Sequence, residues 1–209
     1  MQEGLLYPII MFCAGLWLFK LWLDDARAVS LGTPNKNGFS GATYTSKNIA
    51  ICGACAGVCL LIFAVFLENI TGTSESQTKV SVWAVFGWIA AAFIEELIFR
   101  GYLVIDKKGK FCLITSIFVF SLIFTICHPF FWDYTIPENA DFLSGKFSFD
   151  FSSRAWVSSV VVFVSSLVFY ILRFMPQNVS KSLIPCILAH LSYNLGTFFV
   201  KAIQGYVEF

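Results

Sequence analysis

The sequence predicts an all-α fold, a multi-pass transmembrane helical bundle of about six spans with a polar cavity inside the membrane. The first observation is composition: 57% of the residues are hydrophobic, only 13% are charged, and the mean hydropathy is +0.75. Soluble domains carry about 25% charged residues. The second is that apolar runs of roughly 20 residues, the length that crosses a bilayer, recur along the chain. The third is that ionised side chains lie inside one such run, where each is costly unless it is paired or lines a wet cavity.

The expected spans follow one another through residues 1–209 as a single membrane domain. The first has Glu3 where a signal peptide has basic residues, so we expect this span to stay in the protein. Lysine and arginine are more frequent in the loops that are cytoplasmic if the N-terminus lies outside, which predicts that orientation. The expected spans are Leu5–Leu23, Ile49–Leu67, Val80–Ile105, Phe111–Trp132, Trp156–Phe174 and Ser182–Lys201.

The longest connection between the later spans, Asp133–Arg154, is acidic and aromatic. Within it, Lys146–Phe151 alternates between polar and aromatic residues with the period of a strand. We expect this segment to contribute an aromatic belt at the membrane surface, where such side chains gather. A strand-like segment or an interfacial lid is the alternative.

Cysteine usage and net charge exclude several classes of protein. The seven cysteines lie almost wholly within apolar runs, where thiols behave as small hydrophobes, so we expect no disulfide framework. Cys52 and Cys55 have C-x-x-C spacing without a second pair, which argues against a metal or redox role. The net charge of +1, with a single basic cluster at residues 107–110, gives no support for nucleic-acid binding.

Two carboxylates and a guanidinium, Glu95, Glu96 and Arg100, lie within the apolar run Val80–Ile105. In a helix, Glu96 and Arg100 are four residues apart and share a face, while Glu95 is rotated by about 100°. We therefore expect Arg100 to hold Glu96 and to leave Glu95 free. A structural ion pair that locks two helices together is the alternative. The third charged residue, Glu95, has no partner nearby in the sequence, which favours a catalytic role over a purely structural one.

The only two histidines of the chain also fall within or at the end of expected spans. His128 is followed by Pro129, which favours a helix end there. His190 shares a helical face with Asn194, four residues further on. A single membrane histidine is most simply explained by hydrogen-bonded packing. Two of them, together with Asn194 and the three charged residues, argue for one shared cavity.

These residues form three short motifs. Glu95–Arg100 reads E-E-x-x-x-R, Phe124–His128 reads F-x-x-x-H, and His190–Asn194 reads H-x-x-x-N. In this order and on separate apolar runs, the motifs make the chain resemble the CPBP intramembrane proteases, named for CAAX proteases and bacteriocin-processing enzymes and also called the Abi group. The resemblance covers residues 80–201, which would form the catalytic core.

The resemblance implies an intramembrane endopeptidase that works without a covalent intermediate or a cofactor. The implied base is Glu95, aided by His128, and the implied oxyanion donors are His190 and Asn194. The pair formed by the second glutamate and the arginine would orient the site. These roles suit peptide hydrolysis, which needs a base for the water and donors for the developing charge. The implied partners are the lipid bilayer and a peptide or membrane-protein substrate, with the oligomeric state left open.

Three alternatives stay open. A zinc-dependent intramembrane metalloprotease is the first, since two histidines and a glutamate also form a catalytic zinc set; the lack of an H-E-x-x-H arrangement argues against it. A catalytically silent membrane scaffold is the second, and a transporter with a carboxylate relay, which the absence of inverted repeats disfavours, is the third. We expect a location in the plasma (inner) membrane of a bacterium or the endoplasmic reticulum of a eukaryote. The substrate, and whether it is prenylated, is left open.

Overall fold

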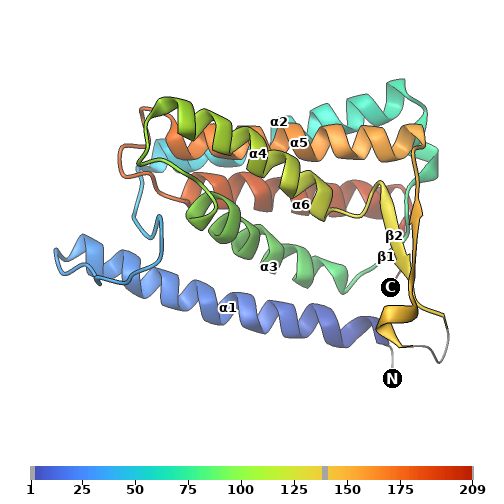
Figure 1. Cartoon of the computed structure of the whole chain (residues 1–209), viewed down its shortest axis with the longest axis horizontal. Coiled ribbons are helices and arrows are strands. Elements are labelled where there is room, and N and C mark those ends of the chain that lie inside the picture. Colours follow the sequence, from blue (N-terminus) through green and yellow to red (C-terminus); the bar gives the residue numbers. More distant parts are fainter. Residues whose placement is uncertain (1–2, 138–140, 209) are drawn as a thin grey trace.

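The computed structural model describes residues 3–137 and 141–208. Over these residues the chain forms a bundle of helices with two small sheets, which confirms the predicted all-α class (Figure 1). α1 begins and α6 ends at the same end of the bundle (Figure 1). The helices are α1 (Glu3–Ser30), α2 (Lys47–Ile70), α3 (Ala84–Glu96), α4 (Lys110–Cys127), α5 (Ser153–Phe174) and α6 (Ile184–Ile203). The short elements are η1 (Thr73–Ser76), β1 (Val80–Ser81), η2 (Leu97–Tyr102), β2 (Trp132–Thr135), η3 (Phe142–Ser144), β3 (Lys146–Phe149) and β4 (Val207–Glu208).

Within the described residues, all the long helices except α3 are long and apolar enough to cross a membrane, and the chain is a multi-pass membrane protein. The third expected span, Val80–Ile105, is shorter than predicted because α3 has only 13 residues. At its start, Val80 and Ser81 form β1, which pairs in parallel with β4, so the helix begins at Ala84. At its end, α3 passes into the π-helical turn η2. The expected six spans are thus five such helices and one shorter helix.

The fourth expected span also ends earlier than predicted. α4 stops at Cys127, because His128 precedes proline and adopts an extended backbone with φ −87° and ψ 123°. The chain then enters β2, which pairs antiparallel with β3 so that Trp132 lies opposite Phe149. The alternation of polar and aromatic residues in this connection therefore reflects a strand, which was the alternative interpretation of the sequence. All four residues of β3 are exposed.

α2 and α6 approach closely through two glycines. A Cβ atom at Gly53 or Gly57 would overlap the backbone of Pro185 or Ala189. Glycines four residues apart allow this contact, which is a common way for membrane helices to associate. The contact holds α6 against α2 directly beside His190.

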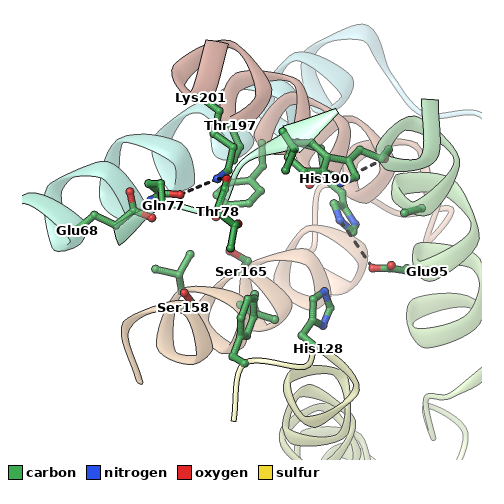
Figure 2. A pocket seen from close by; sticks show the side chains of 18 of the residues that line it. Glu68, Gln77, Thr78, Glu95, His128, Ser158, Ser165, His190, Thr197 and Lys201 are labelled. Carbon is green, nitrogen blue, oxygen red and sulfur yellow. Dashed lines mark hydrogen bonds and ion pairs between the residues drawn. The ribbon is translucent and has the colours of Figure 1, made fainter. Parts of the chain in front are cut away.

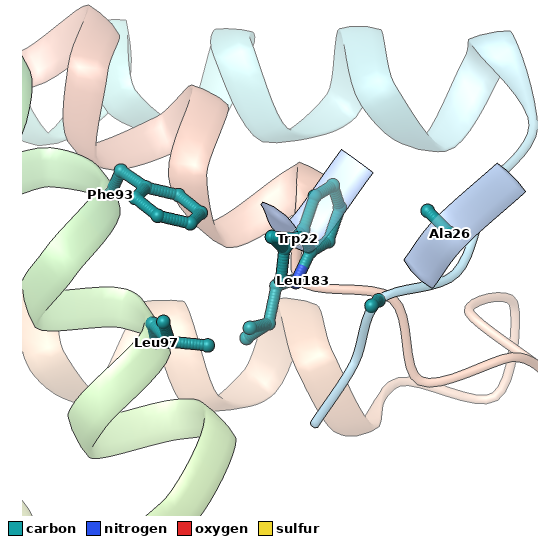
Figure 3. Close-up of a cluster of buried hydrophobic side chains, with 6 residues drawn as sticks. Trp22, Ala26, Phe93, Leu97 and Leu183 are labelled. Carbon is teal, nitrogen blue, oxygen red and sulfur yellow. The ribbon is translucent and has the colours of Figure 1, made fainter. Parts of the chain in front are cut away.

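α3 is fixed from its other side by a buried apolar cluster (Figure 3). Phe93 and Leu97, four residues apart, present one face of the α3–η2 segment to Trp22 of α1 and to Leu183. Trp22 and Leu183 are almost fully buried, with 1% and 0% of their surface exposed. Since neighbouring positions on a helix are rotated by about 100°, this packing turns Glu96 away from α1. The charged face of α3 is thereby directed into the bundle.

Candidate active site

Four of the predicted site residues line one cavity of about 450 Å³ (Figure 2). They are Glu95, His128, His190 and Asn194. They come from the end of α3, the residue that caps α4, and one face of α6. The expected convergence is confirmed for these four. Glu96 is fully buried behind the cavity, which it reaches only through a hydrogen bond to His190.

The second glutamate and the arginine form a fully buried ion pair, as the spacing of four predicted. Arg100 Nη1 lies 3.1 Å from Glu96 Oε1, and neither side chain is exposed. Arg100 Nη2 donates to Ser166 Oγ at 2.7 Å, and Ser166 donates onward to Ser121 at 2.9 Å. The guanidinium therefore connects α3 and its π-helical turn to α5, and through Ser166 to α4.

Aromatic rings surround the same guanidinium. Its central carbon lies 4.5 Å from the ring centre of Phe124, 5.1 Å from that of Phe169 and 4.9 Å from that of Tyr170. Such contacts stabilise a cation that has been removed from water. Sequence reasoning missed Ser166 as the partner of Arg100 and Ser121 as the partner of Ser166. The available signal was the presence of hydroxyl side chains within otherwise apolar membrane helices.

His190 lies between the two glutamates. Its Nδ1 is 2.9 Å from Glu96 Oε1, and its Nε2 is 3.9 Å from Glu95 Oε2. A carboxylate accepts hydrogen bonds and does not donate them, so the Nδ1 atom carries the proton of the shorter contact. The longer contact exceeds hydrogen-bond distance. His190 is thus held on one side and faces Glu95 and the cavity on the other.

His128 is fixed by its own helix. Its Nδ1 lies 2.8 Å from the carbonyl oxygen of Phe124, which can only accept, so Nδ1 donates. The ring stacks on Phe130 with centroids 5.8 Å apart. In the neutral side chain the lone pair therefore belongs to Nε2, which makes this atom a proton acceptor. The turn at Pro129 creates this arrangement by ending α4 at the cavity.

Glu95 and Asn194 differ in how firmly they are held. Asn194 Nδ2 donates to the backbone carbonyl of Trp88 in α3 at 3.0 Å, and the amide has a second N–H to offer. Glu95 Oε2 is buried and makes no hydrogen bond with the described residues. The Glu95 side chain keeps 31% of its surface exposed. Glu95 is therefore the free carboxylate of the pair, as predicted.

Replacing Arg100 with lysine is expected to be severe. The planar guanidinium of arginine holds Glu96 with one N–H group and Ser166 with another. The compact ammonium of lysine cannot reproduce that geometry. Removing one partner of a buried ion pair costs about 3–5 kcal/mol of stability, and lysine, which keeps the charge but loses the planar fork, is expected to cost part of that amount. Thermal unfolding of the purified protein measures this loss, and Arg27→Lys, at an exposed arginine paired with Asp24, is the matched control. An unchanged melting temperature in Arg100→Lys would show that the network does not depend on the guanidinium.

The side chains do not form a metal-binding set. Among the described residues, no group of three or more histidine, cysteine, aspartate or glutamate side chains is placed to hold an ion. Nδ1 of His190 is engaged with Glu96, which itself is paired with Arg100. Cys52 and Cys55 are free thiols exposed on α2, apart from the cavity. In this structure Glu95, His128 and His190 are not gathered as a metal set, and chelation decides between a zinc-dependent and a metal-free mechanism.

Comparison with known proteins adds one match. A family model described as "Type II CAAX prenyl endopeptidase Rce1-like" matches residues 77–196, which is more than half of the chain. The matched region contains all three sequence motifs. No curated protein and no solved structure matches.

Proposed function

We propose that this chain, which belongs to the type II CAAX prenyl endopeptidase Rce1-like family, hydrolyses peptide bonds in its cavity by direct attack of water. Membership of that family supports a CAAX protease acting on a peptide or membrane-protein substrate. The residue roles are our proposal. Glu95 and His128 activate the water, and His190 and Asn194 stabilise the oxyanion.

In the first step, a water molecule attacks the carbonyl carbon of the substrate. The Glu95 carboxylate accepts a proton from this water as its oxygen forms the new C–O bond. Nε2 of His128, which faces the cavity as an acceptor, provides a second base for the proton. Such a positioned base contributes about 10²–10⁴-fold to the rate. Ser158 and Ser165 line the cavity but belong to none of the three motifs and have no histidine as a hydrogen-bond partner among the described residues, so we assign the attack to water.

In the second step, the tetrahedral intermediate collapses. Its negative oxygen accepts hydrogen bonds from Asn194 Nδ2 and from His190 Nε2, and preorganised donors of this kind act strongly in a site shielded from bulk water. The C–N bond breaks, and the proton taken from the water returns to the leaving amine from Glu95 or His128. The products are a new carboxylate and a new amine, so the protein is regenerated.

The buried ion pair explains how His190 can be a donor at Nε2. Because Nδ1 donates to Glu96, Nε2 also carries a proton only when the ring is an imidazolium. The Glu96 carboxylate stabilises that positive charge at 2.9 Å. Arg100 holds Glu96 in place at 3.1 Å. Glu96 and Arg100 therefore act as positioning residues, without touching the substrate.

The single observation that carries the proposal is the contrast between the two adjacent glutamates. Glu96 is fully buried and held at Oε1 by Arg100 and His190, whereas Glu95 faces the same histidine from 3.9 Å and keeps 31% of its side chain exposed. A packing role would bury and ion-pair both carboxylates, whereas only Glu96 is fully buried and paired with an arginine. A silent scaffold is therefore the weaker explanation.

The deciding experiment is cleavage of a peptide library by the purified protein, with products identified by mass spectrometry. The reaction is run in ¹⁸O-labelled water, and Glu95→Ala is the control. We expect cleavage by the wild-type protein only, with one heavy oxygen in the new carboxylate. A catalytically silent scaffold would leave the library intact.

Removal of divalent ions tests the zinc alternative directly. We expect turnover to be unchanged after exhaustive chelation, and elemental analysis to find no stoichiometric metal, since we assign the activation of water to Glu95 and His128. A zinc enzyme would lose activity on chelation and regain it with added zinc. That result would replace the proposed mechanism while leaving the protease assignment intact.

A further inference from the structure

The connection between α4 and α5 contains a two-stranded hairpin with one aromatic face. β2 and β3 pair antiparallel, so that Trp132 lies opposite Phe149. Two residues further along β2, Tyr134 lies opposite Phe147. Paired residues, and residues two apart on one strand, point to the same side of a sheet, so these four rings share a face. The ring centre of Phe147 lies 4.7 Å from that of Tyr134 and 6.0 Å from that of Trp132. The opposite face carries Asp133, Thr135, Lys146 and Ser148.

Much of this aromatic face is exposed. Phe147 and Phe149 have 63% and 67% of their surface exposed, and Phe151, two residues after β3, has 68%. An isolated two-stranded hairpin is at best marginally stable in water, and it gains stability when its apolar face is packed against something else. A contiguous exposed apolar patch marks a surface that binds a protein or a membrane.

A hydrogen bond from Trp132 turns the aromatic face toward the end of α4. Trp132 Nε1 donates to the backbone carbonyl of Ile126 at 2.8 Å. Ile126 belongs to the last turn of α4, which is long and apolar enough to cross the membrane, and its side chain is exposed. The Trp132 side chain therefore points back toward the membrane-spanning helix. Because the four rings share a face, Phe147 and Phe149 point to the membrane side of the hairpin as well.

The hairpin lies at the level of the membrane surface. β2, with β3 paired to it, runs across the end of the bundle rather than along it (Figure 1). Since α4 and α5 cross the membrane, an element across their ends lies along the membrane surface, where aromatic side chains gather. Trp156, an exposed residue in the first turn of α5, continues the same band, and its ring centre lies 4.8 Å from that of Phe131. The aromatic face is thus continuous with the lipid-facing surfaces of two membrane-spanning helices.

We propose that the β2–β3 hairpin is a lipid-binding surface, whose aromatic face lies in the interfacial layer of the bilayer beside the end of α4. This inference goes beyond the proposed function and does not depend on it. The occupant is a zwitterionic phospholipid, because the hairpin has an excess of negative charge that disfavours anionic headgroups. Burial of the rings drives the binding, while the polar face stays in water. The charged residues among the described positions from Trp132 to Phe151 are Asp133, Asp141, Asp150 and Lys146.

The test places a photo-crosslinking side chain at single positions of the full chain in phosphatidylcholine nanodiscs. p-Benzoylphenylalanine replaces Phe149 on the aromatic face or, as the matched control, its neighbour Ser148 on the polar face. Phe118, an exposed ring within α4, is the positive control for lipid contact. After irradiation, mass spectrometry identifies the product at each position. We expect lipid adducts as the main product at positions 149 and 118 and about 10-fold fewer at 148, since neighbours on a strand point to opposite faces.

Three other products would each overturn the inference. A crosslinked dimer would show that a second copy of the chain covers the aromatic face. A crosslink to residues of the cavity in the same chain would show that the hairpin closes over the cavity as a lid. Equal lipid yields at positions 148 and 149 would show that neither face is preferred. Phe147, on the same face, provides a second labelling position if the protein labelled at 149 does not fold.

A charge variant tests the aromatic face itself. With the label at position 149, Phe147→Asp should lower the yield of lipid adducts by about 10-fold, because it replaces a buried ring with a charge on the membrane side. Ser148→Asp is the matched control and should leave the yield unchanged, since its carboxylate points into water. An unchanged yield in Phe147→Asp would overturn the inference.

The composition of the nanodisc tests the kind of lipid. Addition of phosphatidylglycerol, an anionic lipid, should not raise the yield of adducts at position 149 above that in phosphatidylcholine alone. Adducts that form only in the presence of the anionic lipid would overturn the assignment to a zwitterionic phospholipid. None of these measurements requires cleavage of a peptide, so failure of the proposed function would leave their results unaffected.

Discussion

Replacing Glu95 with glutamine is expected to lower kcat by about 10²–10⁴-fold, the contribution of a positioned general base. Glutamine has nearly the same shape but cannot accept the proton of the attacking water. KM should change little, because the side chain acts on water and does not hold the peptide. Since Oε2 of Glu95 has no hydrogen bond to lose among the described residues, the melting temperature should stay near that of the wild type.

Steady-state cleavage of a library-derived peptide, together with thermal unfolding, measures both quantities. Glu75→Gln is the matched control, because Glu75 is an exposed glutamate of η1 outside the cavity. A Glu95→Gln variant with normal kcat would exclude Glu95 as the base. His128→Gln would then be the next variant to measure, since Nε2 of His128 is the other acceptor at the cavity.

Replacing Asn194 with alanine is expected to lower kcat by about 10²–10³-fold, the effect of removing one oxyanion donor. The reason is that Asn194 can offer its second Nδ2 proton to the negative oxygen while the first binds the carbonyl of Trp88. Asn194→Asp should be worse than alanine, because it keeps the size of the side chain but directs a negative charge at the oxyanion.

The control separates this role from the contact with Trp88. Asn69→Ala removes an exposed asparagine that donates to a backbone carbonyl of its own helix α2 at 2.8 Å, and it should leave kcat unchanged. If Asn194 were only a link between α6 and α3, its alanine variant would lose thermal stability with little change in kcat. Equal kcat for Asn194→Ala and Asn194→Asp would also contradict the oxyanion role.

Local geometry made part of the site predictable. The pairing of Glu96 with Arg100 followed from a spacing of four, which places two side chains on one face of any helix. The same rule left Glu95 free, and it placed Asn194 beside His190. The end of α4 at His128 followed from the proline after it, which disfavours the helical backbone of the preceding residue. Each of these features depends on residues at most five positions apart in the chain.

Several features escaped sequence reasoning because they depend on distant parts of the chain. The third expected span was drawn too long, since a hydropathy pattern does not reveal that Val80 pairs with Val207 as a strand. The hydrogen bonds from Arg100 to Ser166 on α5, and from Ser166 to Ser121 on α4, were missed for the same reason. The orientation of the bundle in the membrane stays a prediction.

The sequence by itself determined that this protein spans a membrane and that it carries a small set of polar groups within apolar helices. Composition decides the first, because so few charges cannot cover a soluble surface, and the cost of an unpaired charge in hydrocarbon decides the second. Only the tertiary structure decided which of these groups meet. The glycine contact between α2 and α6, and the packing of Phe93 against α1, direct His190 and Glu96 toward each other. Contacts between helices depend on side-chain shapes that are far apart in sequence, so no local pattern contains them.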